Sequence, residues 1–257
     1  MERWLDGYRC APPILRNEYC LWANDFTNEP EILQMKAMNR IFQPTAALAL
    51  VALFSCLSGP ARAGLEEGVT AYQAGDLPLA FKEFHSIAET GNADGQFNVA
   101  LMYEQGIGVA KDEQQAIVWY KKSAQQGNSN AQFNLGVLYE NGRGSAVDFA
   151  LARQWYRKAA AQGDALAIGN LGMLYVRGDG VKVDKVAGLA LLLQSATMDN
   201  SAENHAKRNI AATKGLTPAT IEAAQNLLAE FGEAKNLLLP LDQYLKSTTS
   251  NAGSESQ

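Results

Sequence analysis

The sequence predicts an all-α fold, a right-handed α-solenoid of stacked antiparallel helix pairs. Three observations predict it: a repeat of 36 residues, two apolar stripes at helical spacing in each repeat, and glycines between the stripes. The period relates Gly91, Gly127 and Gly163; Tyr103, Tyr139 and Tyr175; Asp112, Asp148 and Asp184; and Trp119 and Trp155. A single helix pair cannot bury its apolar stripe, so units of this length must stack on one another.

Residues 35–63 contain the parts of a secretory signal peptide in the required order. Lys36 and Arg40 form a short positive region, an uncharged apolar run follows, and a Gly-Pro pair ends the run. The last three residues, Ala-Arg-Ala, have the small-x-small pattern that signal peptidase recognises. The run is short for a membrane span, which needs about 20 apolar residues; the alternative interpretation is a buried core helix. We expect cleavage near Ala63 and a periplasmic or secreted protein.

Residues 1–34 mix Trp, Cys, Pro and charge without a sustained period. Because signal peptides have short positive regions, we expect translation to begin at Met35 or Met38 and residues 1–34 to be an upstream extension that the natural protein lacks. Cys56 follows a small residue, as in a lipoprotein signal, although Phe54 is bulkier than such signals favour. We expect membrane contact only if Cys56 is lipidated.

Two stripes predict the two helices of each repeat. The first stripe is Ala131, Leu135, Leu138 and Tyr139, and the second is Ala116, Trp119, Tyr120, Ser123 and Ala124. Gly-x-Gly elements at 106–108, 142–144 and 178–180 separate the helices, because glycine tolerates the positive φ that ends a helix. The aspartates at 112, 148 and 184 are placed to cap the second helices, and Gly127-Asn128 is placed to join two repeats.

The pattern G-N-x-x-A-Q-F-N-L-G-x-L-Y-x-x-G-x-G, followed by a capping Asp and A-x-x-W-Y-x-K-A-A, resembles the Sel1-like repeat, a variety of tetratricopeptide repeat. It covers residues 91–126, 127–162 and 163–198, and the third unit has Leu191 and Leu192 where the others have Trp-Tyr. The resemblance implies a binding scaffold of the secreted or periplasmic bacterial type. It is far more specific for fold than for function.

The units at either end are less regular. Residues 64–90 resemble a shorter, ordinary tetratricopeptide unit without the Gly-x-Gly element. Residues 199–232 predict C-terminal capping helices, the second of which starts at Thr217-Pro218. The remaining residues, 233–257, end in a stretch rich in Ser, Thr, Asn and Gly, so we expect a largely disordered tail.

Composition and motifs exclude several function classes. The net charge is −5 and no run of Lys or Arg occurs, which argues against a nucleic-acid partner. All three cysteines precede the repeats, and His85 and His205 stand alone, so we expect no metal and no cofactor. The repeats contain no G-x-S-x-G, H-E-x-x-H or Walker motif, so we assign no catalytic residue and expect no enzyme activity.

Superhelical arrays expose a concave face that is lined mainly by the first helix of each repeat, and this face suits an extended peptide or a partner's helix. A helical wheel assigns to it Phe97, Asn98, Leu101, Met102, Phe133, Asn134, Val137, Asn170 and Met173. The three asparagines can pair with a partner's backbone amides. The alternative is that they bond to the backbones of neighbouring repeats and contact no ligand.

Two function classes remain. The first is a non-enzymatic adaptor of the bacterial cell envelope that binds a protein or peptide. The second is a secreted hydrolase or binder of a cell-wall, β-lactam or polysaccharide substrate, with Glu104 and Glu140 as candidate paired carboxylates and the Trp-Tyr pairs as candidate sugar platforms. Their simpler interpretations are solvated helix ends and inter-repeat core. A groove with apolar and amide groups favours the first class, and clustered carboxylates favour the second.

Overall fold

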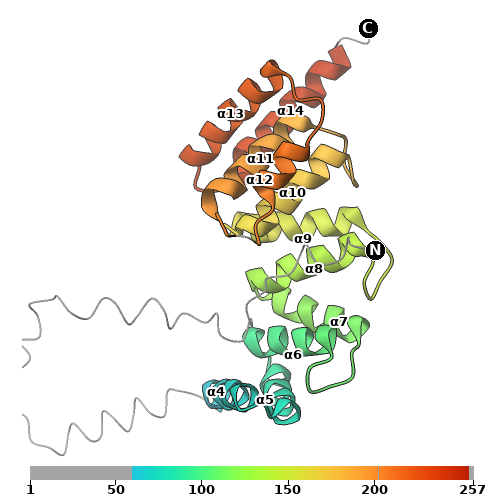
Figure 1. Cartoon of the computed structure of the whole chain (residues 1–257), viewed down its shortest axis with the longest axis vertical. Helices are drawn as coiled ribbons and strands as arrows, with labels where there is room; N and C mark the ends of the chain where they lie inside the picture. Colours follow the sequence, from blue (N-terminus) through green and yellow to red (C-terminus); the bar gives the residue numbers. More distant parts are fainter. Residues whose placement is uncertain (1–59, 202, 255–257) are drawn as a thin grey trace, which may run out of the picture.

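The computed structural model describes residues 60–201 and 203–254, which form antiparallel helix pairs stacked into an α-solenoid (Figure 1). The helices are α4 (Pro60–Gln73), α5 (Leu77–Glu89), α6 (Ala93–Gln105), α7 (Glu113–Gln125), α8 (Ser129–Asn141), α9 (Phe149–Ala161), α10 (Ala165–Arg177), α11 (Lys185–Met198), α12 (Ala206–Ala212), α13 (Pro218–Glu233) and α14 (Leu238–Ser254). The expectations for residues 1–34, for most of the signal peptide and for Cys56 lie outside the described residues. The expected cleavage point, after Ala63, falls in the first turn of α4.

The same side chains begin and end the helices of each repeat. The carboxylate of Asp148 accepts a hydrogen bond of 2.9 Å from the backbone N–H of Leu151, which caps α9. Gly142 ends α8 in the left-handed conformation, and its N–H donates to the backbone oxygen of Leu138. Asp112 and Asp184 cap α7 and α11 in the same way. These contacts confirm the predicted caps.

The second glycine of each Gly-x-Gly element brings consecutive units into contact. Gly144 has a φ of 69°, and a Cβ at this position would lie 2.4 Å from the backbone oxygen of Glu113, at the start of α7. Gly108 and Gly180 approach the starts of α5 and α9 in the same way. Only glycine combines this φ with this approach, so the Gly-x-Gly loop fixes the stacking of one repeat on the one before it.

The core runs along the stack, and both predicted stripes are buried in it. Each first helix packs against the second helix of its own repeat and against that of the preceding repeat; α6, for example, lies against both α5 and α7. Trp119 is buried, with the Lys122 ammonium 3.5 Å from its ring centroid, whereas Trp155 is only partly buried. The burial of Trp119 agrees with the interpretation that the Trp-Tyr pairs belong to the core between repeats and do not form sugar platforms.

The C-terminal region corrects one expectation. We expected a largely disordered tail at 233–257, but Leu238–Ser254 form α14, which packs on α13, α11 and α9 (Figure 1). Leu237 and Leu241 are buried, and Asp242 accepts two hydrogen bonds from Arg157, of 2.9 and 2.7 Å. The apolar residues of this segment follow helical spacing, and the polar composition of its final stretch obscured that pattern. No helix in the described part of the chain is both long and apolar enough to cross a membrane.

Candidate functional site

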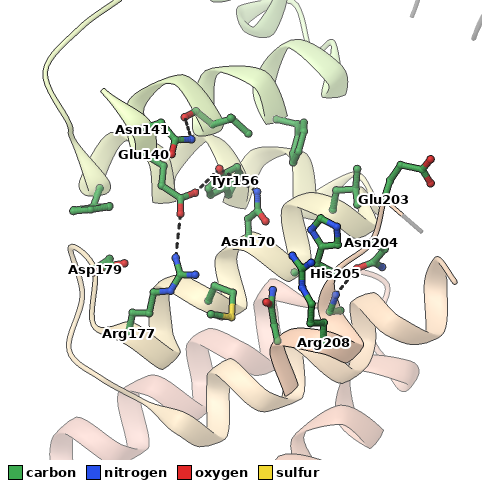
Figure 2. A pocket seen from close by; sticks show the side chains of 18 of the residues that line it. Glu140, Asn141, Tyr156, Asn170, Arg177, Asp179, Glu203, Asn204, His205 and Arg208 are labelled. Atoms are coloured by element: carbon green, nitrogen blue, oxygen red, sulfur yellow. Dashed lines mark hydrogen bonds and ion pairs between the residues drawn. The ribbon is translucent and has the colours of Figure 1, made fainter. Parts of the chain in front are cut away.

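An open groove of about 1050 Å³ lies between α8, α10 and α12 (Figure 2). It is therefore lined by first helices, the helices to which the sequence analysis assigned the binding face. Its larger apolar side chains are Phe133, Val137, Phe149, Leu166 and Met173, of which Phe149 belongs to the second helix α9, and its amides are Asn141, Asn170, Asn204 and Asn209. Its charged or titratable side chains are Lys111, Glu140, Arg143, Arg177, Asp179, Glu203, His205 and Arg208.

The structure divides the predicted binding residues into two groups. Phe133, Val137, Asn170 and Met173 line the groove, but Phe133 and Val137 are only 2% and 3% exposed, so Asn170 and Met173 offer the accessible surface. The others, Phe97, Asn98, Leu101, Met102 and Asn134, do not line it, and all of these except Asn134 are buried.

The helical-wheel assignment is therefore corrected for α6. Met102 is fully enclosed, and the ring centroid of Phe97 lies 5.8 Å from that of Tyr120 on α7. A wheel assumes one buried face, but α6, like α8 and α10, is covered from two sides, in its case by α5 and α7. Its side chains leave little surface for a partner.

The asparagines bond within the array. The amide of Asn134 donates to the hydroxyl of Tyr120 at 2.9 Å, and that of Asn170 donates to the hydroxyl of Tyr156 at 3.1 Å. Both bonds join neighbouring repeats, but the acceptor is a side-chain hydroxyl and not the backbone that the alternative interpretation named. At the position equivalent to Tyr120 in the preceding unit stands Phe84, which offers Asn98 no hydroxyl. Partner contact by the asparagines stays a prediction, and of the three only Asn170 lines the groove.

Glu104, Tyr120 and Asn134 form what we call the first triad, in which Glu104 and Tyr120 are buried. The Tyr120 hydroxyl donates to Glu104 at 2.6 Å, and Arg143 donates to the same carboxylate at 3.0 Å. Arg143 also donates to Glu113 at 2.9 and 2.6 Å. Glu104 is only 2% exposed, and this burial raises its pKa to about 7 in spite of the hydrogen bond from Tyr120. The interpretation of Glu104 as a solvated helix end is wrong.

Glu140, Tyr156 and Asn170 form the second triad, which lies at the groove (Figure 2). The Tyr156 hydroxyl donates to Glu140 at 2.7 Å, and Arg177 lies 3.6 Å from the other oxygen of that carboxylate. Burial raises the pKa of Glu140, while the hydrogen bond from Tyr156 and the charge of Arg177 oppose the rise. Each glutamate thus binds its own tyrosine, and Glu104 does not line the groove.

Arginines reach the groove from both walls. Arg177, at the end of α10, has a side chain that is 48% exposed. Arg208 is exposed on α12 and lies across Asn170 from Arg177 in the view of Figure 2. His205 precedes α12 and also lines the groove.

Sequence reasoning missed this second wall. Residues 199–209 do not share the repeat period, so nothing in their pattern marked His205 or Arg208. The local fold depends on Asn204, whose amide donates to the backbone oxygens of Ser195 and Asp199 at 2.9 and 2.8 Å. Those bonds bring the start of α12 to the groove. Since Asn204 is one asparagine among many, its role had no sequence signal.

The groove has the chemistry of a noncovalent binding site, with apolar side chains, amides and charges on facing walls. Within residues 60–201 and 203–254, no three His, Cys, Asp or Glu side chains gather where they would hold a metal ion.

Comparisons with known proteins agree with this architecture. Residues 93–128, 129–164 and 165–200 match the model of the Sel1 repeat. The crystal structure of a Sel1 repeat protein from Oxalobacter formigenes is similar with a TM-score of 0.55 and 29% identity, over 67% of this chain and 74% of that one. A protective antigen of uropathogenic Escherichia coli strains that displays an SLR fold matches with a TM-score of 0.55 and 28% identity over 76% of this chain, but only 47% of that protein's length is covered. No curated protein matches the chain.

Proposed function

Because this chain is a Sel1 repeat protein, and such proteins generally mediate protein–protein interactions as non-catalytic scaffolds, we propose that it binds a protein or peptide partner in the groove between α8, α10 and α12. The observation that carries the proposal is the groove itself, which places apolar side chains beside amides on two first helices. Its volume of about 1050 Å³ is at the upper end of small-molecule pockets, which span ~300–1,000 Å³, and it suits a few residues of extended chain.

The composition of the groove supports binding over hydrolysis. Phe149, Leu166 and Met173 provide partly exposed apolar side chains, and Asn141 and Asn170 provide amides. The best-placed carboxylate, Glu140, is already bonded to Tyr156 and lies near Arg177. Extended segments are held by such mixtures, because apolar pockets take side chains while amides bond to the backbone.

We also propose that the partner belongs to the bacterial cell envelope. The support is the signal-peptide pattern at residues 35–63. Cell fractionation with N-terminal sequencing of the native protein tests this part separately. A protein that stays in the cytoplasm with residues 35–63 attached would contradict it.

Site-specific photo-crosslinking tests the groove. A photoreactive amino acid replaces Asn141, which is exposed and lines the groove, or, as control, Gln225, which is exposed on α13 and does not line it. Both full-length proteins are expressed in the cells that produce the chain and are irradiated. We expect a discrete protein adduct from position 141 and none from position 225. Identical adducts from both positions, or none from position 141, would refute a groove-bound protein partner.

A further inference from the structure

The second helices α7 and α9 carry cations in a part of the chain that has no acidic residue. The whole chain contains 22 Lys and Arg against 27 Asp and Glu. By contrast, residues 114–139 contain two lysines, residues 149–163 contain two arginines and a lysine, and neither stretch contains Asp or Glu. Since α7 and α9 both pack against α8, an acidic molecule has these cations on neighbouring helices.

Three exposed lysines of these helices lie on aromatic rings and have no counter-ion. The Lys122 ammonium is 3.5 Å from the ring centroid of Trp119, and the Lys158 ammonium is 4.0 Å from that of Trp155. Lys121 lies 5.6 Å from the centroid of a tyrosine ring. Within the described part of the chain, no carboxylate is within ion-pairing distance of any of the three. A lysine that already packs on a ring loses less side-chain freedom when it binds an anion, so these ammonium groups are pre-positioned.

The repeat places Lys121 of α7 beside Trp155 of α9. The residues 36 positions earlier are His85 and Trp119, whose ring centroids are 5.3 Å apart. Trp155 is half-buried, whereas Trp119 is only 7% exposed. A partly exposed aromatic surface therefore lies between the lysines of the two helices, and tryptophan is among the residues that contribute most to protein interfaces.

Helix α14 shows how an acidic helix binds the next part of this face. It packs against α9, where Asp242 accepts two hydrogen bonds from Arg157 and the neighbouring Leu241 is buried. Arg157 precedes Lys158 in the chain and is the equivalent of Lys121 one repeat earlier. A helix of this chain thus supplies a carboxylate and an apolar side chain at one repeat, and Lys121 has no such carboxylate within the described residues.

From these observations we propose that Lys121, Lys122, Trp155 and Lys158, here called the outer strip, bind an acidic amphipathic helix of a partner protein. The partner helix lies beside α14, its carboxylates meet the three lysines, and one of its apolar side chains covers Trp155. None of the four residues lines the groove, so the outer strip is a second binding surface and does not rest on the proposed function.

A protein helix fits the outer strip better than other anions do. Polybasic clusters that bind a lipid surface contain about 4–8 Lys or Arg, and nucleic acids are held through many phosphate contacts, whereas the outer strip has three lysines around a tryptophan. The net charge of −5 repels extended polyanions from the rest of the molecule. Local charge complementarity to a few carboxylates is therefore the interaction that the strip supports.

Display of a library of helical peptides against the full-length protein tests the proposal. Enriched peptides are synthesised with their Asp and Glu residues intact or replaced by Asn and Gln, and fluorescence anisotropy measures their affinities. We expect enriched peptides to combine carboxylates at one-turn spacing with an apolar residue. We expect the amide versions to bind about tenfold more weakly, as the loss of three exposed ion pairs would give. A selection that enriches no acidic peptide would overturn the proposal.

Two triple variants of the outer strip locate the effect. Glutamine in place of Lys121, Lys122 and Lys158 is expected to lose about tenfold in affinity for the acidic peptides. Arginine at the same three positions is expected to retain the affinity, because it keeps both the charge and the contact with the rings. An arginine variant that bound as weakly as the glutamine variant would contradict a role for the charge.

A control with the same change in net charge alters three exposed lysines outside the outer strip. It combines Lys182→Gln, Lys214→Gln and Lys235→Gln and is expected to bind as the natural protein does. Circular dichroism and urea unfolding verify that every variant folds. Equal affinity of the outer-strip glutamine variant and this control would overturn the proposal.

A groove-blocking variant, Asn141→Trp, separates the outer strip from the proposed function. We expect the acidic peptides to bind this variant with unchanged affinity. Acidic peptides that lose affinity in Asn141→Trp but bind the outer-strip glutamine variant normally would refute the outer strip and support binding in the groove. Phosphatidylglycerol vesicles or oligothymidylate that displace the acidic peptides at lower concentration than the peptides displace one another would replace the partner helix with a lipid surface or a nucleic acid.

Discussion

The first and second triads contain the same three residue types at the same repeat positions, and in each the tyrosine hydroxyl donates to glutamate and accepts from asparagine. Their surroundings differ. The Glu104 side chain is 1% exposed and lies under Arg143, which Glu113 holds in place. The Glu140 side chain is 18% exposed beside Arg177, which is itself half exposed. At the position equivalent to Glu113, the next repeat has Phe149.

The two junctions contain the same buried residue types, so the groove at the second one arises from differences in the residues around the triad. The first triad closes the junction between two repeats under Arg143. In the next repeat Asp179 stands at the position of Arg143, and a second wall is present, so the second triad lies at the floor of the groove. The added wall is α12 with the residues before it. Function in such an array can therefore depend on the residues that break the period, while the periodic ones maintain the stack.

The largest expected effect on the free energy of unfolding comes from a substitution of Gly144, whose contact with Glu113 keeps Arg143 over the first triad. Gly144→Ala introduces a Cβ at a φ of 69° and 2.4 Å from the backbone oxygen of Glu113. The start of α7 must move, and Glu113 then no longer holds Arg143. We expect a loss of about 3–4 kcal/mol in the free energy of unfolding, measured by urea denaturation. Gly127→Ala is the control, because Gly127 has a φ of 97° but no atom within 4 Å of the added Cβ. It should lose only about 1–2 kcal/mol, and equal losses would contradict the role of the contact.

The second largest effect should be a dependence of the free energy of unfolding on pH, caused by Glu104 of the first triad. Burial raises the pKa of Glu104 from 4.5 to about 7, so the folded protein holds this proton more tightly than the unfolded chain does. The stabilising contribution is complete below pH 4.5 and is lost as the pH rises through about 7. We expect a fall on the order of 3 kcal/mol across this window.

Glu104→Gln tests the assignment, since glutamine cannot titrate. Urea denaturation at several pH values should show a flatter profile for this variant than for the natural protein. Glu140→Gln is the matched change in the second triad and should flatten the profile less, because Glu140 is more exposed. A profile that Glu104→Gln leaves unchanged would assign the dependence to other groups.

Removing one hydroxyl from each triad gives a smaller difference. Tyr120→Phe leaves the enclosed Glu104 without its 2.6 Å donor and Asn134 without its acceptor, which we expect to cost about 2 kcal/mol. Tyr156→Phe removes the same bonds, but solvent in the groove can replace them, so we expect about 1 kcal/mol. Urea denaturation at pH 8 compares the two. A larger loss for Tyr156→Phe would reverse our ranking of the two environments.

Most of the fold follows from the sequence, because its causes are local and repeated. The capping aspartates, the Gly-x-Gly turns and the apolar stripes each have a physical role that recurs every 36 residues. Helix α14 was missed because its apolar residues occur once and are followed by a polar stretch. The coarse family function follows from the repeat type, but the partner does not.

The site was predictable only in part. Of the residues assigned to the binding face, Phe133, Val137, Asn170 and Met173 line the groove, and partner binding there stays a prediction. The residues on α6, and Phe133 and Val137 on α8, are buried because each first helix has two packing partners, and a helical wheel does not register the second. The burial of Glu104 depends on Arg143, which lies 39 residues away in the chain. No local pattern reports such a contact, and the same holds for the wall formed by α12.

The smallest expected effect compares the arginines beside the two triads. Arg177→Gln removes a half-exposed side chain whose carboxylate contact is 3.6 Å long, so we expect a change within about 0.5 kcal/mol in the free energy of unfolding. Arg143→Gln, the matched change at the first triad, should cost clearly more, since its side chain is 18% exposed and bonds two carboxylates. Thermal and urea unfolding of both variants at one pH give the comparison. If Arg177→Gln destabilised the fold as much as Arg143→Gln, the charge of Arg177 would be needed for the stack in spite of its exposure.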